Sequence, residues 1–113
     1  MRFIQIFEFT TTRIDAVEAL MDNWVAQSEG RRTVVRSVLT ADRDRPLTYV
    51  QIVEFSSFEG AMQNSALAET AEFAQRLAEL CEEPPRFRNL DLVRTDEFAG
   101  PQLDNTAGKL PLV

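Results

Sequence analysis

Histidine is absent from this 113-residue sequence, and cysteine occurs only once, at Cys81. Without histidine the chain lacks the commonest general base, the usual haem ligand and most transition-metal ligand sets. A single cysteine cannot form an internal disulfide, and the apolar helical register around it favours a buried structural thiol. We therefore expect the protein to use no metal and no cofactor.

Long apolar runs and basic clusters are also missing. No run approaches the roughly 18 residues that a membrane span needs, and the opening "MRFIQIFEF" has no signal-peptide cleavage pattern. Acidic residues outnumber basic ones by 18 to 12, and the arginines are scattered rather than clustered. With no phosphate-binding loop, nucleophile elbow or CxxC pair, we expect a cytoplasmic protein that binds neither membranes nor nucleic acid.

What is present is a regular alternation of strand and helix patterns. Apolar residues recur with a period of two in some segments and at helical spacing in others. Thr12 is a candidate N-cap for the first helix, and Ser65 for the second part of a kinked second helix. We expect a strand, a helix, two strands, a helix and a strand at residues 3–10, 13–29, 33–41, 47–55, 57–83 and 86–94.

The order β-α-β-β-α-β predicts an α+β fold of the ferredoxin-like type. In this arrangement two right-handed crossovers place both helices on one face of a four-stranded antiparallel sheet. We expect one such domain over residues 1–97. Residues 98–113 have no periodicity, so we expect a C-terminal tail or an arm that wraps a dimer partner.

Alternation along the strands divides their side chains into an aliphatic set and an aromatic, polar set. The simplest assignment turns the aliphatic set toward the helices: Ile4, Ile6, Val35, Leu39, Val50, Ile52, Leu90 and Leu92. The opposite face then collects Gln5, Phe7, Phe9, Arg36, Tyr49, Gln51, Phe55, Phe87, Asn89 and Asp91. Because so many aromatic rings are not left in water, we infer a homodimer whose two sheets enclose a small-molecule cavity.

A family resemblance rests on this element order, on "YVQIVEFSSFEGAMQNS" and on the "ETAEFAQRL" that follows. Residues 3–95 resemble the dimeric α/β-barrel superfamily, and within it the antibiotic-biosynthesis-monooxygenase-like domains. The resemblance implies a homodimeric barrel and, as activities, cofactor-independent oxygenation or cyclisation of polyketide-derived aromatics. Several relatives have a polar residue facing the cleft near Asn64, and cavity arginine and aromatic residues correspond here to Arg36 and Tyr49. Branches that ligate haem through histidine cannot be matched.

Four residues are candidates for catalysis: Arg36, Tyr49, Asn64 and Asp91. Arg36 and Asn64 would hold a substrate anion, Tyr49 would donate a hydrogen bond or a proton, and Asp91 would accept a proton. A structural ion pair between Arg36 and Asp91 is the alternative reading of those two. For ligand binding we expect Gln5, Phe7, Gln51, Phe55, Phe87 and Asn89.

Two functions of different classes remain open. The first is a cofactor-free monooxygenase or a cyclase that acts on a small aromatic or polyketide-like compound. In a monooxygenase, the carbanion or phenolate of the substrate itself would reduce dioxygen. The second is a non-catalytic homodimer that binds a small hydrophobic ligand or serves in assembly. A haem-handling protein would require Tyr49 or Cys81 as the iron ligand.

Overall fold

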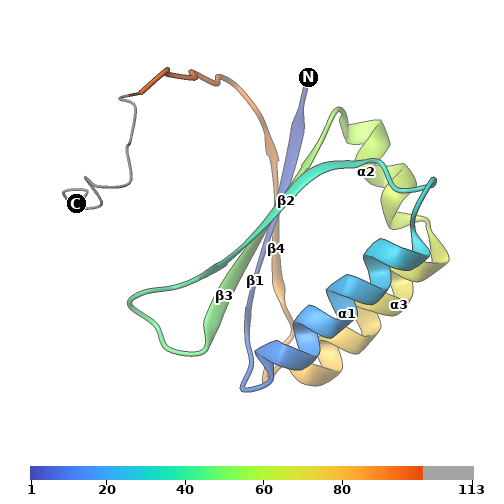
Figure 1. The fold of residues 1–113 in the computed structure, drawn as a ribbon, viewed down its shortest axis with the longest axis vertical. Coiled ribbons are helices and arrows are strands. Elements are labelled where there is room, and N and C mark those ends of the chain that lie inside the picture. Colours follow the sequence, from blue (N-terminus) through green and yellow to red (C-terminus); the bar gives the residue numbers. More distant parts are fainter. Residues whose placement is uncertain (101–113) are drawn as a thin grey trace, which may run out of the picture.

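A computed structural model of the chain describes residues 1–100, so most of the tail expected at 98–113 lies outside the described residues. Four strands form one antiparallel sheet in the order β2-β3-β1-β4, and the helices cover one face of it (Figure 1). The α+β, ferredoxin-like prediction is confirmed. The elements are β1 (Phe3–Thr10), α1 (Ile14–Gln27), β2 (Val34–Ala41), β3 (Thr48–Phe55), α2 (Phe58–Ser65), α3 (Ala68–Leu80) and β4 (Arg86–Asp91).

The segment expected as one kinked second helix consists of two helices, α2 and α3. Ser57 caps α2, because its side-chain oxygen accepts a hydrogen bond from the Gly60 amide at 3.0 Å. Ser65 is the last residue of α2 and does not cap α3, whose N-cap is Leu67 without a side-chain hydrogen bond. The prediction of a Ser65 cap is therefore wrong.

The start of α1 is organised by Thr11 rather than by Thr12, so the Thr12 cap is also wrong. The buried Thr11 hydroxyl oxygen accepts a hydrogen bond from the Arg13 amide at 2.9 Å and donates one to the Leu80 carbonyl at 2.6 Å. Thr12 is exposed. One threonine thus joins the end of β1, the start of α1 and the end of α3.

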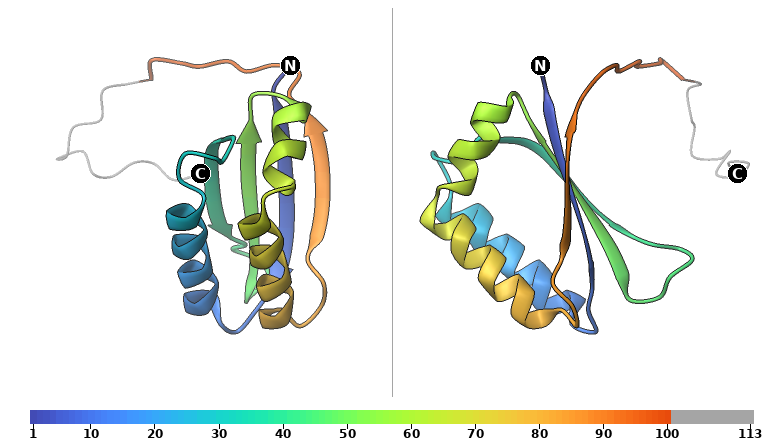
Figure 2. Two further views of the ribbon diagram at one scale, coloured as in Figure 1. Left: turned by 90° about the vertical axis from the view of Figure 1, so that its right-hand side faces the viewer. Right: turned by 180° about the vertical axis from the view of Figure 1, so that it is seen from behind.

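The two faces of the sheet are reversed relative to the prediction. The helices cover one face of the sheet and leave the other uncovered (Figure 2). The phenylalanines that alternate along β1 are buried in the core beneath the helices, whereas the aliphatic residues between them lie on the uncovered face. The uncovered face also carries charged residues, and burying these beneath helices without partners would be costly. Its members along the three strands β1, β3 and β4 are Ile4, Ile6, Glu8, Val50, Ile52, Glu54, Arg86, Arg88 and Leu90.

Strand β2 follows a different phase from its neighbours. Its register with β3 shifts between Val34 and Arg36, which marks a bulge. Beyond the bulge Leu39 packs against the core beneath the helices, as expected, while Arg36 pairs with Glu54 on the uncovered face. The prediction that Arg36 and Asp91 share a face was wrong. Alternation tells which residues of one strand share a face, but it does not tell which face of the sheet that set occupies relative to the next strand.

Helices α1 and α3 lie side by side across the sheet (Figure 2). Val17 of α1 and Leu77 of α3 are completely or almost completely buried beneath them. Cys81, just after α3, is half-buried against the same core, and this burial raises the pKa of its thiol. Among residues 1–100, no helix is both long and apolar enough to cross a membrane.

Candidate ligand cavity

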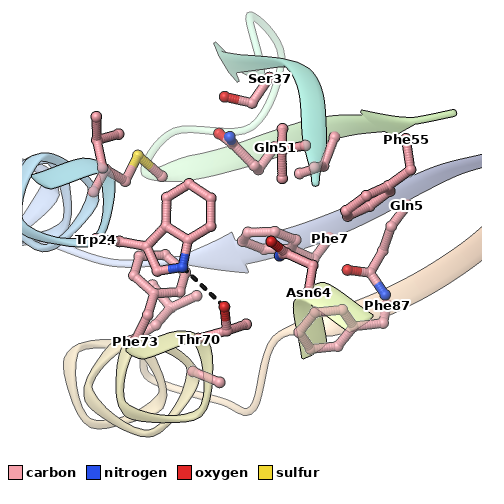
Figure 3. A pocket seen from close by; sticks show the side chains of 16 residues that line it. Gln5, Phe7, Trp24, Ser37, Gln51, Phe55, Asn64, Thr70, Phe73 and Phe87 are labelled. Carbon is pink, nitrogen blue, oxygen red and sulfur yellow. Dashed lines mark hydrogen bonds between the residues drawn. The ribbon is translucent and has the colours of Figure 1, made fainter. Parts of the chain in front are cut away.

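A cavity of about 150 Å³ lies between the aromatic face of the sheet and helices α1 and α3 (Figure 3). Residues from every described element contribute to its lining, so the complete fold is needed to form it. The exposed side chains of Val25 and Phe87 stand at its edge. Its lining residues are Gln5, Phe7, Met21, Trp24, Val25, Val34, Ser37, Gln51, Val53, Phe55, Asn64, Thr70, Phe73, Ala74, Leu77 and Phe87.

The strand register builds the floor of the cavity from two adjacent rows of side chains. One row runs Leu39, Gln51, Phe7 and Phe87 across the four strands, and the next runs Ser37, Val53, Gln5 and Asn89. Gln51 and Gln5 therefore occupy diagonal positions, about 7–8 Å apart by Cα spacing. The part of the floor that lines the cavity presents two neutral amides, Gln5 and Gln51, and the Ser37 hydroxyl among apolar groups.

The helices supply a wall that holds the chain's single tryptophan. Trp24 on α1 donates a hydrogen bond from its indole Nε1 to Thr70 Oγ1 on α3 at 2.9 Å (Figure 3). This bond satisfies the indole N–H and fixes the ring against the cavity. Apolar spacing along the helix would place Trp24 in the core, but it forms part of the cavity wall.

Asn64, at the C-terminal end of α2, closes another side of the cavity and is only 6% exposed. Its Oδ1 accepts a hydrogen bond from the Thr33 amide at 3.3 Å, and the Thr33 hydroxyl donates to the Gly60 carbonyl at 2.5 Å. Thr33 thereby fixes both the helix and the asparagine side chain. Within the described residues no hydrogen bond uses the Asn64 Nδ2, which remains able to donate.

Gln51, in the middle of β3, is likewise only 6% exposed. Its Oε1 is buried and has no hydrogen-bond partner among the described residues. Gln5 differs, because its Nε2 donates to Asn89 Oδ1 at 3.1 Å. The two floor amides are thus unequal: one is held by a neighbour, and the other is unsatisfied.

The cavity lining contains no acidic, basic or histidine side chain. The described part of the chain also contains no group of three or more His, Cys, Asp or Glu residues placed to hold a metal ion. Polar contacts with a bound molecule would therefore come from side-chain amides and hydroxyls. Such groups complement a neutral or weakly acidic ligand better than a strongly charged one.

The structure brings together only some of the residues expected at the site. Asn64 lies in the lining, as do five of the six expected ligand-binding residues: Gln5, Phe7, Gln51, Phe55 and Phe87. Asn89 lies just outside and holds Gln5.

Three of the four candidate catalytic residues lie outside the cavity lining. Tyr49 stacks on Phe9 with ring centroids 5.7 Å apart. Asp91 is exposed at the end of β4. Arg36, on the uncovered face, has its Nε 3.8 Å from Glu54 Oε1. Most of the residues expected to line a cavity between two sheets instead line a cavity within one chain, and Arg36 pairs with Glu54 rather than with Asp91.

The sequence analysis missed the helical side of the site, above all Trp24, Thr70 and Phe73. Apolar residues at helical spacing look the same whether they pack solidly or line a cavity. A usable signal did exist on the strands: Glu8 and Glu54 alternate in phase with the aliphatic residues, whereas Gln5 and Gln51 alternate with the aromatics. The face without charges is the better candidate for burial.

Comparisons with known proteins support the fold. No protein-family model matches the chain, and no curated protein matches its sequence significantly. Among solved structures, this chain is similar to SnoaB, a cofactor-independent oxygenase from Streptomyces nogalater that was solved as an asparagine-to-alanine variant. The two share 18% sequence identity, and the TM-score is 0.71. The matched region covers 83% of this chain and 95% of SnoaB.

Two further solved structures show the same likeness. A candidate antibiotic biosynthesis monooxygenase from Bordetella bronchiseptica has 18% identity and a TM-score of 0.68 over 82% of this chain and 98% of that one. A conserved protein from Methanosarcina mazei Go1 has 8% identity and a TM-score of 0.70 over 80% and 91%. At these identities the likeness concerns the fold, and the chain has the ferredoxin-like fold of antibiotic-biosynthesis-monooxygenase-like proteins.

Proposed function

We propose that this protein is a cofactor-free monooxygenase whose substrate is a small hydroxylated aromatic compound bound between the sheet and helices α1 and α3. The observation that carries the proposal is the composition of the cavity: aromatic walls, neutral amides and no ionisable side chain. The fold shared with the oxygenase SnoaB adds support.

The proposed reaction uses the acidity of the substrate itself. A C–H group between an aromatic ring and a carbonyl loses its proton to give a resonance-stabilised carbanion. That anion reduces dioxygen, and the resulting hydroperoxide loses water, so CH₂ and O₂ become C=O and H₂O. The protein would contribute orientation, exclusion of water and hydrogen bonds to the developing oxyanion.

Among the residues first considered, Asn64 retains a proposed catalytic role. Its free Nδ2 can donate to an enolate or phenolate oxygen, while Thr33 holds its Oδ1. Arg36 and Asp91 are not among the residues that line the cavity, and Tyr49 packs against Phe9. The proposal therefore assigns proton acceptance to water at the cavity edge near Phe87.

We also propose that the protein is a homodimer formed through the uncovered face of the sheet. Half-buried aliphatic residues occupy its centre, including Ile6, Val50 and Ile52. Ion pairs lie at opposite ends of the same face, where Glu54 meets Arg2 and Arg36, and Glu8 meets Arg45 with Oε1 2.9 Å from Nη2. An apolar centre with a charged rim is the arrangement that two associating sheets require.

The size of the cavity favours a second candidate, a non-catalytic binding protein for a small aromatic molecule. A dry cavity of about 150 Å³ holds a single benzene ring, and the volume here is similar. An oxygenase substrate of several rings would need to extend past the exposed Phe87 and Val25. The two candidates differ in whether oxygen is consumed.

Oxygen uptake in the presence of hydroxylated aromatic ketones that carry an acidic CH₂ group tests the proposal. We expect uptake with one product carbonyl formed per dioxygen, and about a hundredfold loss of kcat in Asn64→Leu, the usual effect of removing one oxyanion donor. Gln63→Leu, on the exposed side of the same helix, is the matched control and should retain activity. Binding of these compounds without oxygen uptake would support the binding protein instead.

A further inference from the structure

Gln51 lines the cavity, its side chain is deeply buried, and its Oε1 has no hydrogen-bond partner among residues 1–100. Its register neighbours in the same row are Phe7 and Leu39, and neither side chain can donate a hydrogen bond. We propose that Gln51 is the specificity-determining residue of this cavity and accepts a hydrogen bond from the hydroxyl group of the bound aromatic ligand. This inference rests on the proposed site but not on its catalytic activity.

The argument begins with the cost of the unsatisfied oxygen. A buried acceptor that lacks a donor loses its hydrogen bond to water and gains nothing in return, which is why such atoms are rare in folded proteins. A methionine at this position would fill nearly the same volume without that loss. A glutamine here is therefore explained by a partner that arrives from outside the chain.

The neighbouring polar groups narrow the chemistry of that partner. Gln51 offers an acceptor, and Asn64 offers a donor from Nδ2 because its Oδ1 is already bound to Thr33. A ligand that satisfies both has an O–H group and a separate carbonyl or oxyanion. Carboxylates and phosphates would find no cation in the lining, and an ammonium group would find no anion.

Phenol and its methyl ether, anisole, make the sharpest pair of probes. Both present one aromatic ring, but only phenol can donate to Gln51. Trp24 is the chain's single tryptophan and lines the cavity, so its fluorescence reports occupancy directly. We expect phenol to bind the wild-type protein more tightly than anisole does.

Gln51→Met should reduce phenol affinity about 3- to 10-fold, the value of one net hydrogen bond, and leave anisole affinity unchanged. Gln75→Met, at an exposed position on α3, is the matched control and should preserve the preference for phenol. Gln51→Leu repeats the test with a second side chain, and the wild-type preference can be measured without any variant.

Thermal unfolding separates ligand recognition from a structural role. If Gln51 is kept for a ligand, Gln51→Met removes an unsatisfied oxygen and raises the Tm of the ligand-free protein by a few degrees. If Gln51 instead stabilises the fold, the same variant lowers the Tm.

Absence of phenol binding, equal affinity for phenol and anisole in the wild type, or a lowered Tm in Gln51→Met would each overturn the inference. Failure of the enzyme proposal looks different. In that case phenol binds in a Gln51-dependent manner, but no substrate supports oxygen uptake.

Discussion

The two faces of the sheet carry apolar residues of different shapes, and the contrast explains the organisation of the molecule. The covered face carries rings, with Phe7 placed 6.0 Å from Phe9 and 5.2 Å from Phe87 between centroids. The uncovered face carries branched aliphatics such as Ile6 and Ile52, interspersed with charges. Large rings bridge the distance to a helix layer and leave a cavity, whereas short branched side chains suit close packing against a second sheet.

The largest effect is expected from truncating the covered face. Phe9 is 2% exposed and stacks on Tyr49, so Phe9→Ala should lower the free energy of unfolding by about 3–5 kcal/mol. Val38→Ala, on the uncovered face, should cost about 1 kcal/mol or less. Urea unfolding of both variants measures the difference, and equal losses would contradict the assignment of the faces.

A charge in the centre of the uncovered face tests the proposed dimer. Ile52→Asp would set two carboxylates near one another across the interface, and we expect about a hundredfold or greater weakening of association. Light scattering over a range of concentrations measures it. Ala19→Asp, on the exposed side of α1, should have no effect. A wild-type monomer, or an unchanged dimer in Ile52→Asp, would contradict the proposed interface.

The link between the helix layer and the sheet depends on Thr11. Thr11→Val keeps the shape of the side chain but removes its hydrogen bonds to the Leu80 carbonyl and the Arg13 amide. We expect a loss of about 1–3 kcal/mol in the free energy of unfolding, because buried polar groups are left unpaired. Thr12→Val, at the exposed neighbour, should stay within about 0.5 kcal/mol of wild type.

The smallest effect concerns Asp42 in the loop between β2 and β3. The Asp44 amide and the Arg45 guanidinium donate hydrogen bonds to its carboxylate and lower its pKa below the ordinary value of 3.8. A lowered pKa stabilises the fold above the unfolded-state pKa, and this contribution disappears as pH falls through the folded-state value. Acid titration followed by NMR should therefore show the Asp44 and Arg45 amide signals shifting with a midpoint below pH 3.8. Asp42→Asn should abolish that transition.

The sequence predicted the fold because each element carries its own local signal. Alternation in "FIQIFEFT" and helical spacing in "IDAVEALMDNWV" depend only on near neighbours. Which face of the sheet packs against the helices depends on contacts between the sheet and the helix layer. The pattern of a single strand carries no information about those contacts. Glu8 and Glu54 held the missing information, since charges mark the face that the helices do not cover.

Apart from Asn64 on α2, which the family resemblance indicated, the candidate site was predictable only on its strand side. Gln5, Gln51 and Phe87 share a face by register, so their association followed once the pairing was known. The partnership of Trp24 with Thr70 joins two helices and has no local signature in the sequence. Arg36 was misplaced because the phase between β2 and β3, shifted by a bulge, is set by tertiary contacts.

The most direct test of this account is an NMR titration of the protein with phenol. If the ligand occupies the cavity on the covered face, the largest shifts will be at the Trp24 indole N–H and the side-chain amides of Gln51 and Asn64, with the backbone amides of Val38 and Thr40 unaffected. Shifts concentrated at Val38 and Thr40, with Trp24 and Asn64 unchanged, would place the ligand between two sheets and contradict the account.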